Sequence, residues 1–197
     1  MKQYLIILLT FCCVHLLHAQ SFDQYFEDAT LRLDYIFAGN AKEQHIYLQE
    51  LKRQEKWAGR KSRLAEKFLN GNGQVTVRDH ATQQVIYVST FSTLFQEWLQ
   101  YDEAKRVDKA FETSYNVPFP KKSIDVTVTL TNKHQAVTAE MTHTVDPKDI
   151  LIRKIGNNGI PFYYVWKPSN AQKDTPSRPS AANEPRSGKG RNYTASE

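Results

Sequence analysis

The sequence predicts an all-β domain, an antiparallel β-sandwich-like fold with a short helical plug. Three observations lead to this prediction. Several segments alternate apolar and polar residues with the period of two that a half-buried strand requires, most strictly residues 124–130 and 137–145. Turn signals separate these segments, above all the Asn-Gly-Asn-Gly run at residues 70–73. Residues 91–101 instead carry aromatic side chains at helical spacing.

The strand pattern predicts roughly seven to nine strands, preceded by a helical turn at residues 22–26. Residues 45–51 fit a strand or a helix, and we favour a strand because the neighbouring segments are strands. The third and fourth predicted strands form one hairpin, and the sixth and seventh form another. The predicted strands cover residues 31–37, 45–51, 74–79, 85–89, 111–117, 124–130, 137–145 and 150–152.

Two local features refine this pattern. Arg32 and Asp34 lie on the face of the first strand opposite its apolar residues, where we expect a solvated or rim pair. Pro118 and Pro120 follow the fifth predicted strand, and they either end it or place it at a sheet edge, because proline cannot donate a ladder hydrogen bond.

The helical plug is predicted from one stripe of side chains. Phe91, Phe95 and Trp98 would share one face of the helix, and Thr93 stands three residues before Gln96, as in a capping box. Such a stripe either closes the open end of a sandwich or binds a partner.

Trp57 and Arg60 fall in a predicted connection, with Gly59 between them. An aromatic ring beside an arginine could hold a planar or anionic group of a ligand. Alternatively, the tryptophan caps the core, and Arg60 stacks on it or pairs with a carboxylate. Together with Phe91, Phe95 and Trp98, these two residues are the candidate partner-binding residues.

Residues 1–19 have the pattern of a signal peptide. Lys2 precedes an apolar run that is too short to cross a membrane comfortably, and Ala19 is a small residue at the expected cleavage site. Lipid attachment at Cys12 fits poorly, because the bulky Phe11 stands where a small residue is expected. We therefore predict a protein that is secreted or periplasmic and that does not span the membrane.

The predicted folded domain covers residues 20–166, and residues 167–197 have a disordered composition rich in Pro, Ser and basic residues. The formal net charge is +5, of which Lys2 contributes +1 and the tail +3, so the body carries only +1. A nearly neutral body has no electrostatic footprint for a phosphate backbone, which argues against nucleic acid as a partner.

Five blocks of sequence occur in an order that resembles a known family. They are FDQYFEDATLRLDYIFAG at residues 22–39, WAGR at 57–60, FSTLFQEW at 91–98, VPFP at 117–120 and DPKDILI at 146–152. Together they resemble the N-terminal, non-catalytic domain of the secreted bacterial immunoglobulin-A peptidase family of zinc metallopeptidases, over residues 22–165. The resemblance implies a secreted β-rich domain placed before a catalytic zinc domain.

The sequence contains no H-E-x-x-H pair, no G-x-S-x-G and no phosphate-binding glycine motif. We therefore expect no catalytic residue and no cofactor in this chain. The resemblance places the zinc in a catalytic domain beginning near or after Trp166, which we expect to be missing here, as in a shortened or frame-shifted gene.

The expected role is that of a non-catalytic module. It would position or bind a protein substrate such as an immunoglobulin, or pack on the catalytic domain. The alternatives are a carbohydrate- or surface-binding module, a structural spacer, or an enzyme of unrecognised type.

Overall fold

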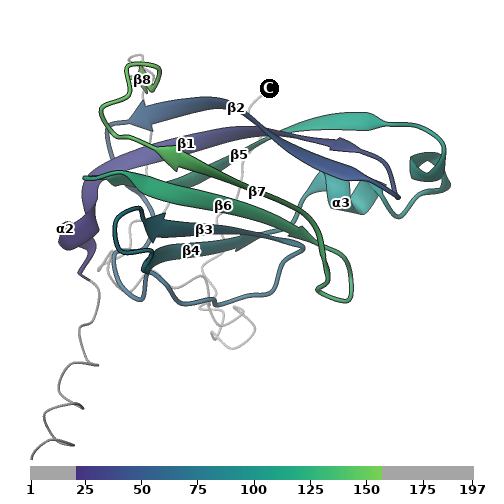
Figure 1. Cartoon of the computed structure of the whole chain (residues 1–197), viewed down its shortest axis with the longest axis horizontal. Coiled ribbons are helices and arrows are strands. Elements are labelled where there is room, and N and C mark those ends of the chain that lie inside the picture. The colour runs from purple at the N-terminus through teal and green to yellow at the C-terminus, as the bar shows by residue number, and fades with distance from the viewer. Residues whose placement is uncertain (1–20, 157–197) are drawn as a thin grey trace, which may run out of the picture.

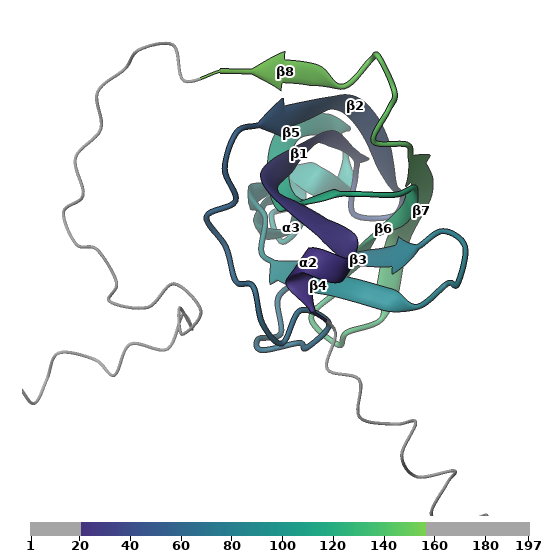
Figure 2. The same cartoon turned by 90° about the vertical axis from the view of Figure 1, so that its left-hand side faces the viewer.

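Residues 21–156 are described by the computed structural model, and they form two four-stranded sheets packed face to face (Figures 1 and 2). The predicted signal peptide, the aromatic run at residues 162–166 and the predicted tail lie outside the described residues. The elements in chain order are α2 (Phe22–Tyr25), β1 (Phe26–Gly39), β2 (Gln44–Gln54), β3 (Gly73–Asp79), β4 (Val85–Phe91), α3 (Leu94–Trp98), η2 (Asp102–Lys105), β5 (Lys109–Pro120), β6 (Ile124–Thr131), β7 (Val137–Val145) and β8 (Arg153–Ile155).

The first sheet has the strand order β5-β1-β2-β8. The long strand β1 pairs antiparallel with both β2 and β5, which confirms a strand at residues 45–51. Strand β8 pairs parallel to β2, through Lys52 and Arg153 among others, so one pair departs from the antiparallel pattern. Strand β5 continues through Pro118 and Pro120 at the edge of the sheet, where proline is tolerated.

The second sheet has the order β4-β3-β6-β7, and all its pairs are antiparallel. Both predicted hairpins are confirmed: β3 pairs with β4, and β6 pairs with β7. The period of two therefore gives the correct pairing wherever a short turn joins two alternating segments.

The core lies between the two sheets. Every second residue of β1 from Leu31 to Phe37 is fully buried, as the alternation predicts. These side chains meet inward-facing residues of the second sheet, which include Val75, Val77, Val126, Val128 and Leu130. Each fully buried apolar side chain of this size contributes about 1.5–3 kcal/mol to stability.

Short helices close the ends of the sandwich (Figure 1). At one end α3 lies under the projecting ends of the first sheet, and its Phe95 is 0% exposed and packs on Phe37 with ring centroids 6.4 Å apart. Thr93 caps this helix by accepting a hydrogen bond from the amide of Gln96 at 3.0 Å, as predicted. The helix is shorter than the aromatic stripe because Phe91 already pairs with Gly73 at the end of β4. No helix within residues 21–156 is long and apolar enough to span a membrane.

The prediction of a buried strand at residues 150–152 is wrong. Ile150 and Leu151 are 94% and 78% exposed, and only Ile152 is buried. The reason is the side chain of Asp149, whose Oδ1 accepts a hydrogen bond from the amide of Leu151 at 2.9 Å. This local bond stabilises a turn in place of a strand, and the strand begins at Arg153.

The outer face of the first sheet carries an ion-pair cluster. Arg32 and Asp34 do pair, but Asp34 is only 4% exposed, so the expectation of a solvated or rim position is wrong for this carboxylate. It accepts hydrogen bonds from Lys52 at 2.5 Å and Arg32 at 2.6 Å, while Glu50 joins Lys52 to Arg153 at 2.7 Å each. Burial alone would raise the pKa of Asp34, but the hydrogen bonds outweigh burial and lower it.

Candidate functional site

The connection between β2 and β3, residues 55–72, runs along the side of the sandwich where β4 is the edge strand. Its middle is fixed by Leu64, which is buried and whose carbonyl accepts a hydrogen bond from the amide of Val88 at 2.9 Å. Its start is fixed by Trp57, which is 9% exposed and donates through Nε1 to the carbonyl of Arg60 at 3.0 Å. These anchors make the connection a fixed part of the fold.

Arg60 is held among aromatic rings and carbonyl groups. Its guanidinium carbon lies 4.6 Å from the ring centroid of Phe68 and 5.3 Å from that of Tyr87. Nη2 donates to the carbonyl of Leu64 at 2.9 Å and to that of Val88, whereas the buried Nε has no hydrogen-bond partner among residues 21–156. Burial lowers the pKa of Arg60, although an arginine remains charged at any pH at which proteins fold.

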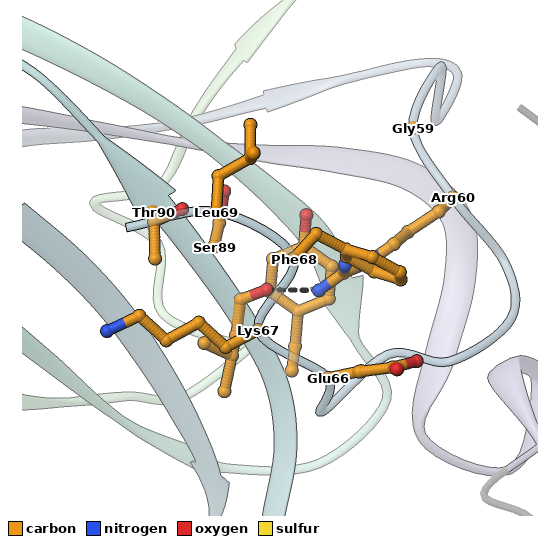
Figure 3. Close-up of a pocket in the computed structure, with 10 residues that line it drawn as sticks. Gly59, Arg60, Glu66, Lys67, Phe68, Leu69, Ser89 and Thr90 are labelled. Atoms are coloured by element: carbon orange, nitrogen blue, oxygen red, sulfur yellow. Dashed lines mark hydrogen bonds between the residues drawn. The ribbon is translucent and has the colours of Figure 1, made fainter. Parts of the chain in front are cut away.

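A hollow of about 390 Å³ surrounds this arginine (Figure 3). The connection contributes Arg60, Glu66, Lys67 and Phe68 to its lining, and strand β4 contributes residues 87–90. In Figure 3 the ring of Phe68 lies by the guanidinium, Lys67 and Glu66 extend to opposite sides, and Ser89 and Thr90 lie on the strand beyond. We name this hollow the β4 groove.

The β4 groove is electropositive. Residues 55–69 carry five cations and two anions, in a body that is almost neutral overall. Arg63 is paired with Glu66 through hydrogen bonds from Nε and Nη2. In contrast, no carboxylate within residues 21–156 lies within ion-pair distance of Arg60 or Lys67.

The edge of β4 is only partly occupied. In an antiparallel pair, the backbone groups of alternate residues face away from the partner strand. The amide and carbonyl of Val88 face outward, and both are used, by Leu64 and by the side chain of Arg60. Two residues further on, the same alternation directs the amide and carbonyl of Thr90 outward, at the lining of the groove.

The structure brings together two of the five candidate residues predicted from the sequence. Trp57 and Arg60 share the anchored connection, but Arg60 neither stacks on Trp57 nor pairs with a carboxylate within the described residues. Phe91, Phe95 and Trp98 lie in a separate aromatic cluster at the α3 end. Phe95 and Trp98 are buried, and Phe91 stacks on Tyr115 with ring centroids 3.9 Å apart.

Sequence analysis singled out only Gly59 and Arg60 among the residues that line the groove, and it missed Lys67, Phe68 and Thr90 among others. A signal for Lys67 and Phe68 was available, because residues 55–69 hold an unusual density of cations within a nearly neutral body. No signal marked Thr90, since only the sheet order makes β4 an edge strand.

Other polar clusters in residues 21–156 connect elements of the fold. No three His, Asp or Glu side chains among these residues converge as a metal site. Asp125 accepts hydrogen bonds from Gln83, Thr144 and His80 at 2.8–2.9 Å, and these bonds lower its pKa to about 2. This cluster ties the β3–β4 turn to β6 and β7, which is a structural role.

Comparison with known proteins identifies the domain. The family model described as the peptidase M64 N-terminus matches residues 21–142, which is most of the described part and more than half of the chain. This match confirms the resemblance to the immunoglobulin-A peptidase family. No curated protein matches the chain significantly. The chain therefore belongs to the family of peptidase M64 N-terminal domains.

Proposed function

We propose that this domain is a non-catalytic, polypeptide-binding module, which holds an extended segment of a protein substrate along β4. The observation that carries the proposal is the pair of outward-facing backbone groups of Thr90 at the lining of the β4 groove. An extended peptide can bind to such an edge by adding a strand, so that main-chain hydrogen bonds supply affinity.

The connection itself gives an internal example of this binding mode. Leu64 accepts a hydrogen bond from the amide of Val88, so one chain segment already pairs with the edge of β4. The next outward-facing residue along the strand, Thr90, borders open space in the groove. A bound segment would continue the pairing there, with Phe68 and Leu69 as apolar contacts.

The family supports the direction of the proposal. An N-terminal module of a peptidase that grips a polypeptide would raise the local concentration of substrate near the catalytic domain. Zinc chemistry would then reside in that catalytic domain, and this module would contribute binding alone. A protein substrate such as an immunoglobulin is the expected partner.

A peptide array with two variants tests the proposal. The purified chain is incubated with overlapping 15-residue peptides that cover an immunoglobulin A heavy chain, and the best binders are measured in solution by fluorescence anisotropy. Thr90→Pro removes the outward amide without removing a bond to β3, and we expect binding to weaken by about tenfold, as loss of a main-chain hydrogen bond plus local strain predicts.

The matched control is Thr90→Val, which keeps the amide and should bind within about twofold of the wild type. Equal binding by the proline and valine variants would exclude strand addition at this edge. Binding to a glycan array with no binding to any peptide would favour the carbohydrate-binding alternative. Absence of both kinds of binding would favour a spacer.

A further inference from the structure

We propose that the β4 groove recognises a carboxylate, so that the polypeptide segment it holds is acidic. This inference rests on the proposed function and specifies its ligand. It depends on the charges of the groove, on which of them are already paired, and on which atoms of Arg60 remain free.

The cations around the groove fall into two groups. Arg63 and Lys61 are already neutralised, the first by Glu66 and the second by Asp28 at 2.8 Å. Lys67 is exposed and forms no ion pair within residues 21–156. Together with Arg60, it leaves two unpaired positive charges facing the same hollow.

Of these two cations, Arg60 has the more defined environment and so restricts the ligand more strongly. One nitrogen, Nη2, donates both of the hydrogen bonds that reach the carbonyls of Leu64 and Val88. Nε is buried and has no hydrogen-bond partner in the described chain. The guanidinium is thus partly removed from water, and it is stabilised by carbonyl dipoles, by aromatic rings and by the charge of Glu66, which does not contact it directly. A ligand carboxylate would supply a counter-charge in direct contact and a hydrogen-bond acceptor.

The contrast with Lys52 shows that this arrangement is unusual within the domain. Lys52 is buried on the outer face of the first sheet, and two carboxylates, Asp34 and Glu50, lie within 2.7 Å of its Nζ. Removal of a charge from water is normally balanced by a partner in this way. In the β4 groove no carboxylate among residues 21–156 lies within ion-pair distance of Arg60, and Glu66, which is paired with Arg63, acts on Arg60 only from further away. A counter-ion in direct contact with Arg60 would therefore come from a ligand.

The form of the ligand follows from the neighbouring backbone. An isolated anion would satisfy Arg60 but would leave the outward groups of Thr90 unused. An extended peptide satisfies Thr90 through its main chain and reaches the cations through its side chains, which alternate on either side of a strand. An acidic peptide is therefore the ligand class that matches both observations.

Two synthetic probes separate the charge from the backbone. The first is a fluorescein-labelled 12-residue peptide of alternating Thr and Glu, and the second has Gln in place of every Glu. We expect the Glu peptide to bind at least about tenfold more tightly at 50 mM salt, and this advantage to shrink at 500 mM salt, because the exposed charge of Lys67 is screened more strongly than that of the partly buried Arg60.

Amino-acid substitutions test which residues cause the preference for the Glu peptide. Lys67→Gln removes an exposed charge without a structural partner, and should weaken binding of the Glu peptide by about threefold to tenfold while leaving the Gln peptide unchanged. Lys148→Gln, at an exposed lysine in the turn before β8, is the matched control and should change neither. Arg60→Lys keeps the charge but loses the planar fork, and should also weaken the Glu peptide selectively.

The outcomes distinguish this inference from the proposed function. Equal affinity of the Glu and Gln peptides would overturn carboxylate recognition and leave peptide binding intact. Failure of both peptides, and of the immunoglobulin peptides, would overturn the proposed function itself. Tight binding of an oligogalacturonate with no binding of the Glu peptide would identify an anionic glycan as the ligand and overturn the acidic peptide.

Discussion

Two basic clusters of this domain differ in how their charges are balanced. On the outer face of the first sheet, Lys52 and Arg32 converge on Asp34, and every charge has an opposite partner. In the β4 groove, Arg60 and Lys67 have no carboxylate partner within residues 21–156. A paired cluster is complete as it stands and adds rigidity, whereas an unpaired one is suited to a ligand.

The largest expected effect on stability comes from Trp57, which anchors the connection that lines the β4 groove. Trp57→Ala should lower the free energy of unfolding by about 3–4 kcal/mol and the melting temperature by roughly 10 °C, because a large buried indole is replaced by a cavity. Trp57→Phe keeps most of the apolar volume and loses only the bond to the carbonyl of Arg60, so about 1 kcal/mol is expected. Thermal and urea unfolding measure both variants, and an unchanged melting temperature for the alanine variant would show that the anchor is unimportant.

The second largest expected effect comes from breaking the ion-pair cluster around Asp34. Asp34→Ala leaves Arg32 without its carboxylate partner and should destabilise the domain by about 2 kcal/mol, less than for a fully buried pair because Glu50 still neutralises Lys52. Peptide binding at the β4 groove should remain within about twofold of the wild type. Asp28→Ala, at an exposed ion pair, is the control and should change stability by less than about 0.5 kcal/mol. Equal destabilisation by the two variants would contradict the distinction between the clusters.

Acidification should lower the stability of the domain through two carboxylates that lie outside the β4 groove. The pKa of Asp34 is lowered in the folded state, and that of Asp125 is lowered from 3.8 to about 2. Since both values are depressed, the stability that these groups contribute is present above about pH 4 and is lost as the pH falls toward 2. The guanidinium of Arg60 remains charged throughout this range.

Urea unfolding from pH 5 down to pH 2.5 measures the loss, and Asp125→Asn should flatten the dependence on pH. A free energy of unfolding that stays constant over this range would show that the two carboxylates have ordinary pKa values in the folded domain.

The smallest expected effect is that of salt on stability. Raising the salt concentration from 50 to 500 mM should change the free energy of unfolding by less than about 0.5 kcal/mol, since buried pairs are screened much less than exposed charges. Binding of an acidic peptide should weaken over the same range. If salt instead destabilised the domain strongly, the cluster around Asp34 would behave as an exposed one.

The fold was predictable because its strands alternate strictly and its turns are short. Residues 124–130 and 137–145 gave the correct hairpin, since a period of two leaves one face for the core. The turn at Ile150 and Leu151 was missed, because three apolar residues in a row resemble a buried strand. The hydrogen bond from the amide of Leu151 to the side chain of Asp149 stabilises a turn instead, and the strand propensity of these residues does not indicate that bond.

The candidate site was predictable only in part. Trp57 and Arg60 stood out because an aromatic residue stands close to an arginine. In the structure Arg60 lines the β4 groove, and Trp57 anchors the connection that carries it. Phe95 and Trp98 could equally be core or surface residues, because an aromatic stripe has the same spacing in both cases, and the structure buries them. The contribution of Thr90 depends on sheet order, which no local pattern encodes.

The prolines of β5 have a consequence for how this domain behaves at high concentration. Pro118 and Pro120 lie opposite Thr30 and Phe26 at the edge of the first sheet. Neither residue has an amide hydrogen, so this end of the edge cannot supply the alternating donors and acceptors that a strand from another molecule needs. Pairing of a strand from another molecule with this end of β5 is therefore disfavoured by covalent chemistry, whatever the side chains around it.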